Sequence, residues 1–410
     1  MHAPLTRRAF SLGALAWCAG AGAQPVPESA ESTDAPETLE TPEAPPDAPP
    51  VSRPYADHEK ALLWAEETAR ARGLDAAWAR EVIASAWFNP DVQRLMRPAA
   101  YNQASSAARN WRAYRKRFLT PVHLQAGARF WQANRPALAR AEAQFGVPAA
   151  VIVGILGVET IYGRNMGRFR VLDALATLAF DFPQEHPRAR QRQVFFAREL
   201  AHFLVLCQRN QLLPGQPEGS YAGAMGLPQF MPSSWLQYAV DFDGDGRIDL
   251  WGSAADAIGS VANYFRAFGW RPGLPTHYAA RLQPQADMRA LLAHDILPTF
   301  SPASLAAQGV LMLEQAQEHD GPLALIELQN GDASEPGNEP LYVAGTENFY
   351  AITRYNWSAY YAMAVIELGQ QVAEKMDGKT SGKTVAKTGA KAATKSVAKP
   401  ARKPGKSAIK

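Results

Sequence analysis

An almost uncharged apolar segment near the middle of the chain most constrains what this sequence can fold into. Between Glu142 and Arg164 the only charged residue is Glu159. An apolar run with no polar face is expected to form a helix that is buried on all sides. The segment from Val147 to Tyr162 therefore predicts a buried helix that carries a single carboxylate.

Glu159 falls in the last turn of this predicted helix, where Gly163 can serve as the C-cap. Burial and the negative end of the helix dipole both disfavour a charged carboxylate, so we expect its pKa to lie above the ordinary value of about 4.3. A carboxyl with a pKa of about 6–7 can act as a general acid near neutral pH. The alternative is a structural glutamate that pairs with Arg164 or Arg168 or turns to solvent.

The remaining patterns are mainly helical. The chain has 410 residues, 47% hydrophobic and 20% charged, which excludes a fully disordered chain and a multi-span membrane protein. Strand-like runs at 323–328 and 349–353 predict a small β unit within about 322–355. Helical patterns, with Asp75 as an N-cap and Pro121 at a first helical position, predict helices at 57–72, 75–87, 120–145, 188–207, 253–268 and 359–374.

The N-terminal 54 residues differ in composition from the region that follows. Residues 1–23 predict an export signal of twin-arginine type, because Arg7 and Arg8 precede a short apolar run and a small-residue cleavage site. A lipoprotein signal through Cys18 is the alternative. Nine prolines among acidic residues, serines and threonines make 24–54 an expected extended linker.

The C-terminal tail explains the basic balance of the whole chain. Residues 375–410 hold ten lysines and Arg402 against Asp377, which gives this segment a net charge of +10 and predicts disorder. The net charge of the whole chain is only +3, and the region 55–374 is left at about −3. We hypothesise that the tail attaches electrostatically to anionic envelope polymers. A tail that only improves solubility is the alternative.

Two stretches have the composition of a ligand-binding wall. Residues 220–233 are dense in glycine, small residues and proline, so their backbone can approach a ligand closely, and Gln229 could hydrogen-bond an amide or hydroxyl. Aromatic residues mixed with Asn and Ser at 350–361 are typical of a sugar-binding surface, and Trp111 and Tyr114 form a weaker cluster. The alternatives are a packed connecting loop and an aromatic core.

Residues 241–249 match the first nine positions of an EF-hand loop, with acids at positions 1, 3, 5 and 9 and glycine at position 6. Position 12 is Gly252 instead of the usual Glu, so the bidentate ligand must come from elsewhere. A structural calcium site is therefore favoured over a sensor, and a solvated acidic turn is the alternative. The expected ligands, within about 241–256, are Asp241, Asp243, Asp245, the Arg247 carbonyl, Asp249 and Asp256.

Other kinds of site find no support in the sequence. Cys207 is expected to be a small core residue, and with Cys18 in the export signal it cannot form an internal disulfide. No histidine pair has zinc-like spacing, and no phosphate-binding glycine loop or nucleic-acid motif is present. We therefore expect no organic cofactor and no nucleic-acid partner.

Taken together, these stretches resemble the lytic murein transglycosylase B family over about Asp57 to Gln371. The likeness rests on five motifs in order: Gly157-Val158-Glu159-Thr160, the run 172–178, the Gly223-Ala224-Met225-Gly226 loop with 229–233, the calcium-like loop, and Ile352-Thr353-Arg354-Tyr355-Asn356. The resemblance implies a mainly α fold for 55–374, with a lysozyme-like α core, an EF-hand-like calcium loop insertion and a small β unit.

The resemblance also implies an activity. The family cleaves the β-1,4 bond between N-acetylmuramic acid and N-acetylglucosamine in peptidoglycan, the expected partner, and works in the periplasm. Glu159 matches the single catalytic glutamate, which would protonate the glycosidic oxygen and then act as base on the muramyl 6-hydroxyl, giving a 1,6-anhydromuramyl end. Membrane attachment would require lipidation at Cys18. The positions that match residues lining the glycan cleft are Tyr114, Ser220, Gln229, Tyr264, Tyr355 and Asn356.

The chain departs from the family pattern after Pro183, where Gln184-Glu185-His186-Pro187 stands in place of an arginine pair. Two rival interpretations stay open. One is a hydrolase with a second carboxylate at Asp173 or Asp181, since two-carboxylate glycosidases need a nucleophile or a base for water. The other is a scaffold that binds the cell wall without cleaving it, against which the presence of Glu159 in its motif argues.

Overall fold

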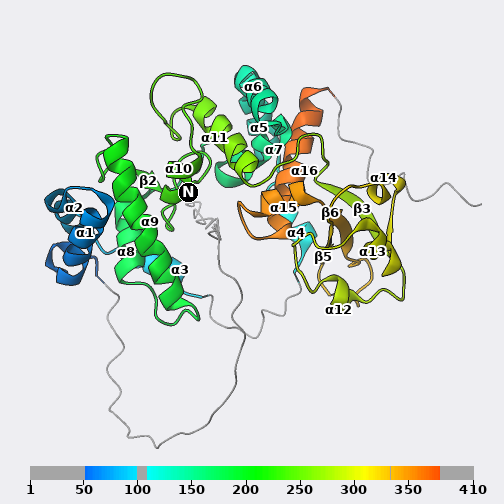
Figure 1. The fold of residues 1–410 in the computed structure, drawn as a ribbon, viewed down its shortest axis with the longest axis horizontal. Helices are drawn as coiled ribbons and strands as arrows, with labels where there is room; N and C mark the ends of the chain where they lie inside the picture. The colour runs from blue at the N-terminus through cyan, green and yellow to red at the C-terminus, as the bar shows by residue number, and fades with distance from the viewer. Residues whose placement is uncertain (1–50, 99–108, 333, 379–410) are drawn as a thin grey trace, which may run out of the picture.

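The computed structural model of the chain describes residues 51–98, 109–332 and 334–378 (Figure 1). The predictions for the signal segment 1–23, for most of the linker 24–54 and for all but the first residues of the tail 375–410 lie outside the described residues. Within the described ranges, no single helix is both long and apolar enough to cross a membrane.

The described part of the chain is mainly helical, as predicted. A 3₁₀ turn, η1, spans Tyr55–Asp57. The α-helices are Glu59–Arg72 (α1), Ala76–Ala84 (α2), Pro90–Met96 (α3), Trp111–Arg115 (α4), Pro121–Ala133 (α5), Arg135–Phe145 (α6), Ala149–Thr160 (α7), Val171–Phe180 (α8), Ala189–Arg209 (α9), Pro232–Tyr238 (α10), Ala254–Ala267 (α11), Met288–Leu291 (α12), Pro302–Ala307 (α13), Glu314–Gln317 (α14), Glu347–Thr353 (α15) and Ala359–Met376 (α16).

The apolar segment forms the buried helix that its composition predicts. Every residue of α7 is buried except Ala150 and Glu159, which are half-buried. Helix α16 packs along it at close range, because glycines at the contact leave room for backbone. A Cβ built on Gly369 would lie 2.0 Å from the Ala150 carbonyl oxygen, and one on Gly154 would lie 2.2 Å from the Val365 carbonyl oxygen. The position of α7 is therefore set by a helix that lies two hundred residues later in the sequence.

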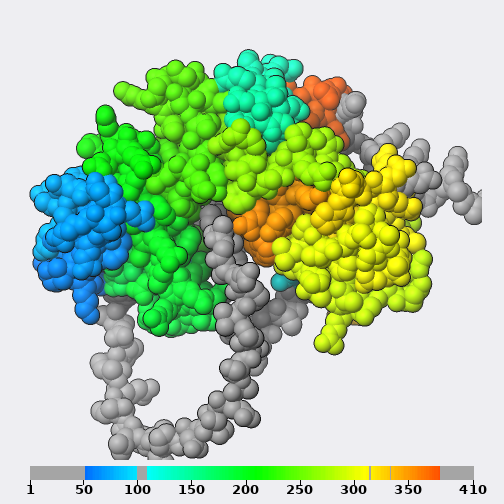
Figure 2. Space-filling view, viewed as in Figure 1, coloured from blue at the N-terminus to red at the C-terminus, as the bar shows by residue number. Residues whose placement is uncertain are grey.

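A small β unit lies at one end of the molecule and the N-terminal helices α1 and α2 at the other (Figures 1 and 2). Its antiparallel sheet has the strand order β4-β3-β6-β5. The strands are His277–Leu282 (β3), Val310–Met312 (β4), Ala324–Leu328 (β5) and Leu341–Gly345 (β6). A separate two-stranded ribbon pairs Phe169–Arg170 (β1) with Glu218–Gly219 (β2).

The structure corrects the predicted extent of this β unit. The strand expected at 323–328 is present as β5, but the segment expected as a strand at 349–353 lies in helix α15. The side chain of Thr346 accepts a hydrogen bond from the Asn348 backbone amide and caps that helix. The sheet also reaches back to His277, well before the expected start at 322. Aromatic and β-branched residues at 349–353 therefore misled the assignment, because a local cap outweighs strand propensity.

The predicted helix boundaries need two further corrections. The single helix expected over 120–145 is two helices, because Asn134 is both the C-cap of α5 and the N-cap of α6. The proline that follows Arg135 has no amide hydrogen to continue α5, but it fits the first turn of α6. The expected N-cap at Asp75 is confirmed, because its side chain accepts from the Trp78 amide. The expected first helical position of Pro121 is also confirmed, because Pro121 begins α5 after the N-cap Thr120.

Candidate active site

The catalytic candidate Glu159 contacts a tyrosine that lies 202 residues later in the sequence. The hydroxyl of Tyr361, in the first turn of α16, donates a hydrogen bond to the Glu159 carboxylate. Burial raises the pKa of Glu159 to about 7, although the Tyr361 hydrogen bond acts in the opposite direction. None of the ion pairs among described residues includes Glu159, so the alternative of pairing with Arg164 or Arg168 has no support.

The chain leaves helix α7 abruptly just after Glu159. The helix ends at Thr160, and the next two residues, Ile161 and Tyr162, both have a positive φ, of 53° and 58°. A left-handed conformation is unfavourable for a β-branched residue, so this turn stores strain directly beside the carboxylate. The expected C-cap was Gly163; the structure places the helix end earlier, and Gly163 instead donates its amide to the Thr160 hydroxyl at 3.0 Å.

The small-residue loop 220–233 is attached to the end of α7. The Thr160 hydroxyl donates to the Leu227 carbonyl at 2.9 Å. Gln229 is buried with a positive φ of 52°, and its amide nitrogen donates to the carbonyls of Met166 and Gly226. Ser220 accepts from backbone amides within the loop. Both side chains therefore hold the backbone of the loop in the structure as it stands.

One residue that holds this loop was missed by the sequence analysis. Glu199 of α9 is 4% exposed, and its two carboxylate oxygens accept from the Ser233 amide at 2.9 Å and the Ser233 hydroxyl at 2.7 Å. Burial raises the pKa of Glu199. Since both of its oxygens are used for anchoring, Glu199 supports the loop. A buried acid within an apolar helical face was its only sequence signal.

Several tyrosines pack between the loop 220–233 and Glu159. Tyr355 stacks on Tyr361 with ring centroids 6.5 Å apart and donates its hydroxyl to the Pro228 carbonyl. Tyr264 packs against Tyr355 at 4.9 Å and donates to the Arg354 carbonyl at 2.6 Å. Burial and the charge of Glu159 raise the pKa of Tyr114 to about 12, so Tyr114 also belongs to this group.

Asn356 follows Tyr355 and is half-buried at the turn before α16. Its backbone carbonyl accepts from the Ser358 amide at 2.7 Å. Tyr361 thus contacts both Glu159 and Tyr355, and Tyr264 packs against Tyr355. Tyr114 packs against Tyr360, the neighbour of Tyr361. Ser220 and Gln229 lie on the loop that bonds to the end of α7, and Asn356 directly follows Tyr355. The sequence analysis included Tyr361 in its aromatic cluster but gave it no role.

The carboxylates considered for a hydrolase are used elsewhere. Asp181 accepts from the Tyr55 hydroxyl and pairs with Arg53, both at 2.5 Å. Asp173 accepts from the Trp87 amide at 2.9 Å and pairs with Arg170 at 3.2 Å. Both acids therefore anchor the N-terminal segment to α8.

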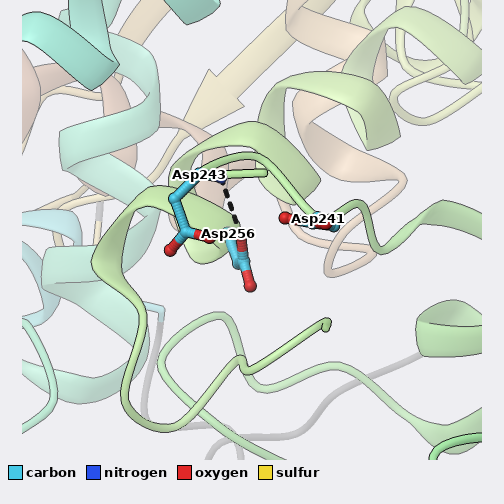
Figure 3. Close-up of side chains that lie close together, drawn as sticks. All are labelled: Asp241, Asp243 and Asp256. Atoms are coloured by element: carbon cyan, nitrogen blue, oxygen red, sulfur yellow. Dashed lines mark hydrogen bonds between the residues drawn. The ribbon is translucent and has the colours of Figure 1, made fainter. Parts of the chain in front are cut away.

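The calcium-like loop brings three carboxylates together, as Figure 3 shows. Ligand atoms of Asp241, Asp243 and Asp256 all lie within 4.8 Å of one another. Asp256, in the first turn of α11, is 1% exposed and accepts from the Phe242 and Asp249 amides at 2.6 and 2.8 Å. This set of carboxylate oxygens fits a hard cation such as calcium, which prefers oxygen ligands.

Of the other expected ligands, the Asp245 and Asp249 carboxylates are not part of this close cluster of side chains, and Arg247 was expected to offer only its backbone carbonyl. The Asp245 side chain accepts from the Arg247 amide at 2.8 Å, and Asp249 accepts from the Trp251 and Gly252 amides. The carboxylates therefore shape the turn by bonding to backbone amides. The lack of a Glu at position 12 is partly offset by Asp256, which lies against the start of the loop.

Comparison with known proteins gives the family. The model of the transglycosylase SLT domain matches residues 57–370. The chain belongs to the transglycosylase SLT family. It is 41% identical over 323 residues to the membrane-bound lytic murein transglycosylase B of Escherichia coli (strain K12), an alignment that covers 78% of this chain and 84% of the relative.

Solved transglycosylase structures share the fold. The soluble lytic transglycosylase SltB1 from Pseudomonas aeruginosa is 39% identical with a TM-score of 0.68, over 78% of this chain and 99% of that one. Escherichia coli Slt35, solved in complex with calcium, is 40% identical with a TM-score of 0.66, over 79% and 95%. The predicted lysozyme-like α core with small β elements is thereby confirmed.

A solved structure at lower sequence identity contains a sugar–peptide ligand. SltB3 from Pseudomonas aeruginosa, in complex with NAG-NAM-pentapeptide, is 28% identical with a TM-score of 0.64, over 78% of this chain and 79% of that one. Over most of its length this SLT transglycosylase is thus similar to murein transglycosylases. The shared region contains Glu159 and the tyrosines around it.

Proposed function

We propose that Glu159 is the acid and then the base with which this lytic murein transglycosylase cleaves peptidoglycan. In its protonated form Glu159 gives its proton to the glycosidic oxygen between N-acetylmuramic acid and N-acetylglucosamine. The bond between this oxygen and the anomeric carbon of the muramyl residue then breaks. The resulting carboxylate takes the proton of the muramyl 6-hydroxyl, whose oxygen bonds to the anomeric carbon. The product is a 1,6-anhydromuramyl end, and no water is consumed.

The observation that carries this proposal is a single half-buried carboxyl whose pKa is raised to about 7. Such a group is protonated in a substantial fraction of molecules at neutral pH, and it is a competent base once it has lost its proton. The Tyr361 hydroxyl can stabilise the carboxylate that forms after the first step. The engagement of Asp173 and Asp181 elsewhere favours this one-carboxylate mechanism over the hydrolase alternative.

The cleft residues support the same proposal. Tyr114 is half-buried near Glu159 and can offer its aromatic face to a sugar ring. Tyr264 and Tyr355 are only 4% and 7% exposed; Tyr264 packs against Tyr355, which stacks on Tyr361. Ser220, Gln229 and Asn356 would line the glycan from the loop 220–233 and from the turn before α16. The relatives' substrates make peptidoglycan strands that bear peptides the expected ligand.

Replacing Glu159 by Gln tests the role directly, because glutamine keeps the shape and cannot transfer a proton. We expect turnover of peptidoglycan to fall by roughly 10³-fold. Glu142→Gln, an exposed acid at the end of α6, is the matched control and should keep full activity. Comparable activity in Glu159→Gln and the parent protein would refute the assignment.

We also propose a structural calcium ion in the loop of 241–256, held by Asp241, Asp243, Asp245, the Arg247 carbonyl, Asp249 and Asp256. The proximity of the Asp241, Asp243 and Asp256 carboxylates supports this proposal, as does the calcium complex of Slt35. The ion would stabilise the loop and the start of α11.

The export signal at 1–23 and a periplasmic location remain part of the proposed function, since peptidoglycan is the substrate.

A further inference from the structure

A cavity of about 850 Å³ lies between the β unit and the helices α4 and α16. Its walls come from α4, from β5, from the start of α16 and from the segment after α12. Of the six residues expected to line the glycan cleft, it includes only Tyr114. In the wall of the cavity Tyr114 packs against Tyr360, and Tyr360 directly precedes Tyr361, whose hydroxyl donates to Glu159, so this wall lies near the Glu159 carboxyl.

The lining of this cavity carries charge of both signs. It includes Arg109 and Arg117, both exposed, together with Asp295 and Glu327. None of these four side chains takes part in an ion pair between described residues. The Arg117 guanidinium lies 5.7 Å from the centre of the Tyr114 ring, so it stands at the end of the cavity nearest Glu159.

The two acids are held in place by neutral donors. The Trp357 indole donates to Asp295 at 3.3 Å. Glu327 accepts from the Tyr342 hydroxyl at 2.9 Å and from the Gln329 amide at 2.8 Å. These bonds orient the carboxylates and leave their negative charge uncompensated by a direct cationic partner. The cavity is therefore suited to a ligand that itself carries both charges.

The charges of peptidoglycan identify which part of it fits. The glycan strand is neutral where the lactyl carboxyl of each muramic acid is bound to a peptide as an amide, whereas that peptide ends in carboxylates and contains a diamino acid with an ammonium group. Guanidinium groups bind carboxylates strongly, and carboxylates bind ammonium. A second run of neutral sugars would gain little from four ionised side chains.

We propose that this cavity binds the peptide stem of a muramyl residue near Glu159, with Arg109 and Arg117 on its carboxylates and Asp295 and Glu327 on its ammonium group. The inference rests on the proposed function, since it places the peptide of the same substrate. It makes these four residues determinants of specificity for strands that still carry peptides.

Binding can be measured without turnover, in the Glu159→Gln background. Two soluble ligands are compared by calorimetry. One is uncross-linked glycan strands with peptide stems. The other is stripped strands, from which an amidase has removed the stems and in which the freed lactyl carboxylates have been converted to neutral amides. We expect the strands with stems to bind more tightly. Arg109→Gln with Arg117→Gln should weaken the binding of these strands about tenfold and leave the binding of stripped strands unchanged.

The matched control is Arg112→Gln, an exposed arginine of α4 that does not line the cavity, which should bind both ligands as the parent does. An equal loss on both ligands would show that the cavity binds sugars, and no loss on either would show that it binds no part of the substrate. Either result overturns the inference. Failure of the proposed function would appear separately, as an absence of products from the protein with Glu159 intact.

Discussion

The hydroxyl of Tyr361 donates a hydrogen bond to the carboxylate of Glu159 across 202 residues of sequence. The two side chains come from α16 and α7, which pack backbone to backbone through glycines. The Glu159 carboxyl is thus held in a helix pair whose geometry leaves little room for change. Its pKa reflects that position, because burial raises it while the Tyr361 hydroxyl lowers it.

Removing the Tyr361 hydroxyl should change the pH dependence of activity. In Tyr361→Phe the carboxylate of Glu159 loses a donor, so its pKa rises above the parent's value of about 7. Because the first step needs protonated Glu159, kcat/KM falls as pH rises through this pKa. We expect the alkaline limb of the profile to move up by about one pH unit. Tyr278→Phe, in the β unit, is the control. An alkaline limb that stays in place would contradict the assignment.

The contact between α7 and α16 should be intolerant of a single methyl group. In Gly369→Ala the new Cβ would lie 2.0 Å from the Ala150 carbonyl oxygen, so the helices must move apart. We expect the free energy of unfolding to fall by about 1–3 kcal/mol, measured by denaturant titration. Gly215→Ala is the matched control, since Gly215 has nothing within 4 Å of the added atom and should be neutral. Equal stability of the two variants would show that the helices can adjust.

Calcium should stabilise the protein without taking part in the chemistry. At a hundredfold excess over its dissociation constant, an ion bound only by the folded state adds about 2.7 kcal/mol, so Tm should rise by several degrees between chelator and calcium. Asp243→Asn should abolish the rise, whereas Asp57→Asn, an exposed acid outside the loop, should keep it. The same Tm in calcium and in chelator would argue against the site.

Much of the site could be predicted because its signals are local. Glu159 stands out as the one charge in an apolar helix, and the acids of the loop at 241–256 follow a recognisable spacing. Asp256 could be predicted beside that loop because a helix was expected to begin at residue 253. These features depend on residues within one or two helical turns of each other, which a sequence displays directly.

The features that could not be predicted depend on residues far apart in the chain. Nothing near Tyr361 shows that its hydroxyl meets Glu159, and the anchoring of Ser233 by Glu199 spans 34 residues. Gly163 was expected to cap α7, but the helix ends at Thr160, whose hydroxyl bonds to the Leu227 carbonyl 67 residues later, and Ile161 takes the positive φ. The strand-like run at 349–353 is a different case, because there a local cap at Thr346 outweighs strand propensity.

The central claim is that an internal hydroxyl, and not water, attacks the anomeric carbon after Glu159 has protonated the leaving oxygen. The most direct measurement is digestion of peptidoglycan sacculi by the purified protein in ¹⁸O-labelled water, with mass spectrometry of the soluble products. Our account predicts products one water lighter than hydrolysed muropeptides, without ¹⁸O, and none from Glu159→Gln. Reducing ends that carry ¹⁸O would contradict it and identify a hydrolase.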